Sequence, residues 1–142
     1  MADLAGKKLL ISVALLFVSS IFIFLTIFTN YKSAGIQKYI SLLISIGFWL
    51  SIILGYIFLF FAQKSVKKDK TKQKIGLLCI FTNKYATVSD VILFASLMTL
   101  IVLSITSFSN STVYIGLISI IFFAFNLHCI FNGRVFNKLI NC

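Results

Sequence analysis

Four long apolar stretches, separated by polar segments, dominate the hydrophobic pattern of this sequence. All four are free of Lys, Arg, Asp and Glu, and they run over Leu9–Thr29, Tyr39–Ala62, Val91–Phe108 and Val113–Phe131. An alternative start of the third stretch at Val88 would include Asp90. A membrane-spanning helix needs about 20 mostly apolar residues, whereas the strands of an outer-membrane barrel alternate apolar and polar positions over about 10 residues. The pattern therefore predicts an all-α polytopic membrane protein, a four-helix transmembrane bundle that forms one integral membrane domain over residues 1–142.

The composition excludes a soluble globular protein. Hydrophobic residues make up 60% of the chain and charged residues 11%, and proline is absent, whereas average globular domains are about 45–50% apolar and about 25% charged. A small soluble domain leaves too much surface in water to hide this amount of Ile, Leu and Phe. The abundance of Ile, Phe, Lys and Asn also indicates an AT-rich bacterial genome.

The basic residues are sorted between the two sides of the predicted bundle. The formal net charge of +10 would suggest a nucleic-acid partner for a soluble protein, but here the bases lie in the gaps between apolar stretches. Only Lys32 and Lys38 occur in the first connection and none in the turn 109–112, while all the others fall in the two termini and the second connection. The positive-inside rule therefore predicts a multi-pass protein of the cytoplasmic membrane with both termini cytoplasmic and no nucleic-acid partner.

The second connection, residues 63–90, is expected to be cytoplasmic and to have two parts. The first is a basic run that fixes topology and contacts anionic lipid headgroups, with about 1 kcal/mol for each base near the leaflet; it comprises Lys64, Lys67, Lys68, Lys70, Lys72 and Lys74. The second part, Ile75–Phe81, is too short to cross the bilayer. We expect it to lie in the headgroup plane with Tyr85 as an anchor, as a linker or as an element that docks on a partner. Thr87–Asp90 resembles a capping box at the start of the third helix, which assigns Asp90 a structural role.

Small residues recur along the second predicted helix. Gly47, Ser51 and Gly55 are four residues apart and share one face, and small residues let membrane helices approach closely. Two interpretations stay open, which are packing inside the monomer and the seam of a homodimer. Trp49 should point away from this face.

Polar residues gather at the inner end of the fourth predicted helix, namely Asn126, His128, Asn132 and Arg134. Polar groups at membrane depth are costly unless they are paired or hydrated. One interpretation is that His128 reaches the interface while Asn132–Gly133 ends the helix, with Gly133 in the left-handed conformation. A second is an inner-face polar site for a partner or a headgroup, and a third is a catalytic or proton-relay histidine. No acidic residue of a span is expected to pair with His128.

The sequence contains no motif for a cofactor, a metal or a nucleotide. We therefore expect no cofactor and a non-enzymatic accessory, regulatory or protective, immunity-like membrane subunit that acts through helix contacts and its cytoplasmic face. Its partners would be the bilayer, anionic headgroups and another membrane protein or a second copy. One alternative is a membrane enzyme that uses His128. Another is a small transporter or pore component, whose polar path would draw on Ser12, Ser19, Ser20, Thr26, Thr99, Ser104 and Asn126.

Overall fold

The computed structural model describes residues 2–29, 36–65 and 79–140. Five helices follow one another in these ranges, and strands are absent from them: α1 (Ala2–Thr29), α2 (Ile36–Ser65), α3 (Lys84–Ile105), α4 (Ser111–Phe131) and α5 (Arg134–Ile140). The predicted all-α class is confirmed. The first four helices are long and apolar enough to cross a membrane, so the chain is a multi-pass membrane protein.

All four long helices begin before the charge-free stretches that predicted them, and α3 ends before its stretch does. α1 begins at Ala2 rather than at Leu9, and α3 covers Lys84–Ile105 rather than 91–108. The charged residues at these ends do not interrupt the backbone hydrogen bonds, because a helix can continue past the hydrocarbon layer into the headgroup region. The earlier start of α3 matters most, because it brings Asp90 into the second turn of a membrane helix.

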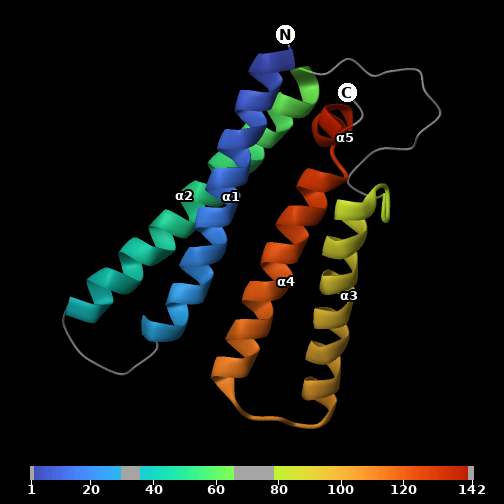
Figure 1. The fold of residues 1–142 in the computed structure, drawn as a ribbon. Coiled ribbons are helices and arrows are strands. Elements are labelled where there is room, and N and C mark those ends of the chain that lie inside the picture. Colours follow the sequence, from blue (N-terminus) through green and yellow to red (C-terminus); the bar gives the residue numbers. More distant parts are fainter. Residues whose placement is uncertain (1, 30–35, 66–78, 141–142) are drawn as a thin grey trace.

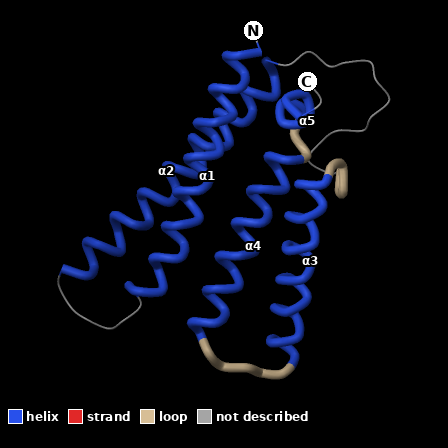
Figure 2. Tube along the Cα trace, viewed as in Figure 1, coloured by secondary structure: helices blue, strands red, loops and turns tan. Residues whose placement is uncertain are grey.

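The four long helices form two antiparallel pairs. α1 packs against α2, α3 packs against α4, and the two pairs meet chiefly through α1 and α4 (Figure 1). The end of α2, the start of α3, α5 and both chain termini lie together at one end of the molecule, here called the terminal end (Figure 2). The opposite, distal end carries the end of α1, the start of α2 and the connection from α3 to α4 (Figure 1).

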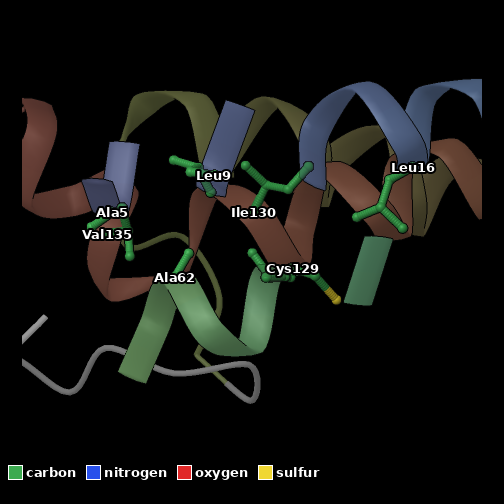
Figure 3. Close-up of a cluster of buried hydrophobic side chains, with 8 residues drawn as sticks. Ala5, Leu9, Leu16, Ala62, Cys129, Ile130 and Val135 are labelled. Carbon is green, nitrogen blue, oxygen red and sulfur yellow. The ribbon is translucent and has the colours of Figure 1, made fainter. Parts of the chain in front are cut away.

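The core of buried apolar side chains lies toward the terminal end. It brings together residues of α1, α2, α4 and α5 (Figure 3), which are Ala5, Leu9, Leu16, Leu59, Ala62, Cys129, Ile130 and Val135. Toward the distal end the two pairs diverge (Figure 1). Among the described side chains, the last buried one of α1 is Ser20, the first of α2 is Ser51 and the last of α3 is Ser96. The tightly packed half is therefore the terminal one.

The small residues of α2 face α1 within the same chain. A Cβ atom added at Gly55 would lie 2.8 Å from Leu16 Cδ2, and one added at Gly47 would lie 2.7 Å from Phe22 Cζ. Ser51 is buried, and the Ser12 hydroxyl donates a hydrogen bond of 2.9 Å to the Gly55 carbonyl. Because α1 already occupies this face, the face is not available to a second copy.

Candidate functional site

The polar residues at the inner end of α4 belong to two clusters rather than one. Asn126, His128 and Asn132 are all buried, but Asn126 faces α1 and α2 whereas His128 and Asn132 face α3 and the segment before it. The candidate inner-face site therefore divides into a clasp around Asn126 and a second group around His128.

The clasp joins three helices through one amide. The Tyr56 hydroxyl of α2 donates to Asn126 Oδ1 at 2.8 Å. Asn126 Nδ2 donates to the Leu16 carbonyl and to Ser20 Oγ of α1, both at 3.4 Å. Hydrogen bonds between membrane helices contribute on average about 0.6 kcal/mol each, so the clasp fixes the register of α4 against the first pair.

The second group is built around a histidine–carboxylate pair. His128 Nδ1 lies 2.5 Å from Asp90 Oδ1, and the exposed fractions of the two residues are 7% and 0%. The expectation that no acidic residue of a span would pair with His128 is therefore wrong. The prediction fails because α3 begins at Lys84 rather than at Val91, so that Asp90 belongs to the helix and lies inside the bundle.

Asp90 does not cap α3. The N-cap is Asn83, whose Oδ1 accepts hydrogen bonds from the backbone N–H groups of Tyr85 and Ala86 at 3.0 and 2.9 Å. The second carboxylate oxygen of Asp90 accepts instead from the backbone N–H of Phe81 at 2.8 Å. The capping-box prediction at Thr87–Asp90 is wrong, and the structural role of Asp90 is to connect α4 with the segment before α3.

Asparagine side chains extend this group toward α5. The Thr82 hydroxyl donates to Asn132 Oδ1 at 2.6 Å. Asn83 Nδ2 donates to the Phe131 carbonyl at 2.9 Å and to Asn137 Oδ1 at 3.0 Å. Asn137 Nδ2 in turn donates to the carbonyls of Phe131 and Gly133, both at 3.0 Å.

We call this second group the polar knot, and its members come from α3, α4, α5 and the residues before α3. They are Thr82, Asn83, Asp90, His128, Asn132 and Asn137. Burying a polar group without a partner is costly, and in the described part of the chain every buried side-chain N or O atom has a hydrogen-bond partner. The polar knot therefore ties the start of α3 to the end of α4 and to α5.

The turn between α4 and α5 is shaped by Gln63. Asn132 caps α4 in a right-handed helical conformation, and the φ of Gly133 lies outside the left-handed region, so the predicted left-handed glycine is wrong. Gln63 Oε1 accepts from the backbone N–H of Arg134 at 2.7 Å, and a Cβ atom at Gly133 would clash with Gln63 Nε2. A side chain at position 133 would therefore displace the end of Gln63, and its Cβ atom would also lie 2.9 Å from the Ile130 carbonyl oxygen.

The remaining predicted site residues lie at the terminal end or outside the described residues. Arg134 is half-buried at the start of α5, and Lys64 is exposed in the last turn of α2. The rest of the basic run falls outside the described residues, namely Lys67, Lys68, Lys70, Lys72 and Lys74. Of the expected interfacial segment, the structure describes residues 79–85, where Ile80, Phe81 and Tyr85 are exposed.

The residues of the predicted polar path do not line one passage. The hydroxyls of Ser19, Ser20 and Thr26 donate to carbonyls of their own helix, α1. Thr99 does the same within α3, where it and Ser104 are exposed. The serines near Asn126 are thus buried in α1, whereas Thr99 and Ser104 lie on the exposed surface of α3.

The sequence identifies His128 and Asn132 but not most of the polar residues that hold the surrounding helix ends. Thr82, Asn83, Asn137 and Gln63 were not candidates, because their polarity is ordinary outside a span. The available signal was Asn83, a favoured N-cap residue that directly precedes the start of the helix at Lys84. A helix that begins at this cap includes Asp90, the partner of His128.

A histidine with a carboxylate partner can act as a general base, and the chemistry of the pair depends on its surroundings. Here the Asp90 carboxylate uses one oxygen for His128 and the other for Phe81. Within residues 2–29, 36–65 and 79–140, no group of three or more His, Cys, Asp or Glu residues could hold a metal ion.

Comparison with protein-family models, with curated proteins and with solved structures gave no match.

Proposed function

We propose that this chain is a non-enzymatic accessory or protective subunit of a bacterial cytoplasmic membrane. It acts through helix contacts inside the bilayer and through a fixed face at the terminal end, which is cytoplasmic. Its surroundings are lipid, anionic headgroups and a partner membrane protein.

The orientation is supported by the charges of the helix ends. Lys7 of α1, Lys64 of α2, Lys84 of α3 and Lys138 of α5 all belong to segments at the terminal end (Figure 1). Because basic residues are retained on the cytoplasmic side, this end is assigned to the cytoplasm.

The observation that carries the proposal is the internal use of the buried polar groups. His128 pairs with Asp90, Asp90 accepts from the Phe81 N–H, and Asn132 accepts from the Thr82 hydroxyl. Polar groups that bind and turn over a substrate need to reach it, whereas these hold the ends of helices in place. Their arrangement supports a protein that presents a rigid surface.

The surface we assign to a partner helix is the distal half of α3. α3 packs chiefly against α4, and its described buried residues end at Ser96. α2, by contrast, has contacts in its distal half, where Gly47 approaches Phe22 and the rings of Phe48 and Phe122 lie 5.6 Å apart. Without a hydrophobic drive between helices in lipid, such a contact would depend on close packing.

Photocrosslinking in native membranes tests this assignment. A photoactivatable residue is introduced at Val102 of α3 or, as a matched control, at Leu42 of α2; these side chains are 56% and 57% exposed in the distal halves of their helices. We expect a discrete protein adduct from Val102 and lipid adducts from Leu42. Lipid adducts alone at both positions would contradict the proposal.

Reconstitution separates the proposal from the transport alternative. Purified protein in liposomes should leave the flux of ions and small solutes at the level of empty liposomes. Flux that requires this chain alone, and that falls when Asn126 is changed to Leu, would favour a transporter and contradict an accessory role.

A further inference from the structure

Phe81 has a backbone conformation that needs an explanation. Its φ is 56°, and among the described non-glycine residues only Ser107 shares a positive φ. A side chain with a Cβ atom is sterically disfavoured in this left-handed region. Such conformations persist where the surrounding structure holds them, and they concentrate at functional positions.

The contact that holds Phe81 leads into the polar knot. The backbone N–H of Phe81 donates to Asp90 Oδ2 at 2.8 Å, and Asp90 Oδ1 lies 2.5 Å from His128 Nδ1. Asp90 is fully buried and His128 belongs to α4. A line of contacts therefore runs from α4 through α3 to one exposed residue.

The strained conformation leaves two apolar side chains outside the bundle. Ile80 and Phe81 are 51% and 49% exposed. In a connection surrounded by water, the exposure of two large apolar side chains would not be favourable. The ring of Phe81 lies 6.5 Å from that of Phe94, an exposed residue of the membrane helix α3. The segment before α3 bends back beside the start of that helix (Figure 1), so Phe81 continues the exposed apolar surface of the terminal half of α3, outside the distal half that we assign to a partner helix.

The neighbouring residues have the composition of a membrane interface. Tyr85 is exposed, and Lys84 Nζ lies 5.2 Å from the centre of its ring. Tyrosine side chains favour the headgroup level, and a lysine held near an anionic leaflet is attracted to it.

We propose that Ile80 and Phe81 form an anchor in the boundary between headgroups and acyl chains, and that the Asp90–His128 pair is the device that positions it. The occupant of this surface is lipid, because Phe81 continues the apolar surface of α3 and Lys84 and Tyr85 stand at its edge. A protein partner on the same surface is the rival outcome. The proposal goes beyond the accessory role and does not depend on which protein contacts α3.

Tryptophan fluorescence measures the depth of the anchor. Trp49 is the only tryptophan of the chain, so Trp49→Phe combined with Phe81→Trp leaves one reporter. The protein is reconstituted into nanodiscs of phosphatidylcholine and phosphatidylglycerol, with bromine placed either close to the headgroup or at the end of the acyl chains. We expect strong quenching by bromine near the headgroup, weak quenching by aqueous iodide and a blue-shifted emission.

Two substitutions at Asp90 test the positioning role. Asp90→Ala removes the acceptor for the Phe81 N–H, so bromine quenching should be lost and iodide quenching gained. Asp90→Asn keeps an acceptor oxygen for the Phe81 N–H but loses the oxygen that faces His128, so the reporter should lie deeper than in Asp90→Ala and less deep than in the native chain. A second reporter, Trp49→Phe with Phe108→Trp, lies just beyond the other end of α3 and should not respond to either substitution.

Several outcomes would overturn the proposal. A Phe81→Trp reporter that iodide quenches freely in protein-containing nanodiscs would exclude the lipid anchor and favour a protein-docking surface. An unchanged depth in Asp90→Ala would remove the positioning role. If Asp90→Ala fails to fold, hydrogen exchange of the Phe81 amide in the native chain decides the matter, because positioning by Asp90 requires that this exposed residue be protected.

Discussion

At the scale of single residues, close approach decides which amino acid is tolerated in the turn after α4. Gly133 has no unusual φ, and its small size matters because Gln63 reaches across from α2 to the backbone N–H of Arg134. From the sequence, Gly133 was identified as the residue after a helix end, but the reason assigned to it was wrong. A turn conformation is a local property, whereas the approach of a side chain 70 residues away is not.

Gly133→Ala should destabilise the protein. The new Cβ atom would displace Gln63 and leave the Arg134 N–H without its acceptor, which costs about 1–3 kcal/mol for a buried group and less for this half-buried one. Thermal unfolding in detergent should show a lower midpoint. In a Gln63→Ala background the added cost of Gly133→Ala should shrink but not vanish, because the Cβ atom would also lie 2.9 Å from the Ile130 carbonyl oxygen. An equal cost in both backgrounds would contradict this explanation.

At the scale of elements, the residue that caps the start of α3 also joins this helix to its neighbours. Asn83 caps the helix with its oxygen and bridges to Phe131 and Asn137 with its nitrogen. Asn110, the N-cap of α4, accepts from Thr112 and Val113 in the same way. A comparison of the two asparagines therefore distinguishes the contribution of the helix cap from that of the bridges to α4 and α5.

Asn83→Ala should cost more than Asn110→Ala. Loss of an N-cap costs about 1 kcal/mol, and Asn83 adds the bridges to α4 and α5. Asn83→Asp keeps the capping oxygen and loses the donor, so it should not restore the native stability. Unfolding of the three variants by denaturant measures these differences; equal stabilities of Asn83→Ala and Asn110→Ala would mean that the bridges contribute nothing.

α3 also illustrates what the sequence can and cannot predict, because its membrane-spanning part was predicted and its first residue was not. Absence of charge locates the hydrocarbon layer, and it located all four membrane helices. It does not locate the ends of a helix, because a cap such as Asn83 can begin the helix several residues outside the layer. The missed turns contain Asp90, so the missed boundary also hid the partner of His128.

At the scale of the whole molecule, the orientation of the bundle is open to direct test. Alkaline phosphatase fused after Cys142 should be inactive, since it folds only outside the cytoplasm, and a green fluorescent protein fusion there should fluoresce. The same phosphatase inserted between Ser109 and Asn110, in the connection at the distal end, should be active. An active phosphatase after Cys142 would reverse the assigned orientation.

The sequence by itself determined the fold class, the number of membrane helices and the charge asymmetry, because hydropathy and charge are sums over neighbouring residues. Only the tertiary structure decided that Gly55 packs against Leu16, that the helix pairs diverge at the distal end, and that the polar residues of α4 serve two clusters. His128 and Asp90 are 38 residues apart, and Tyr56 and Asn126 are 70 apart. Such pairs form because buried polar groups must find partners, and which partners lie within reach depends on how the helices pack.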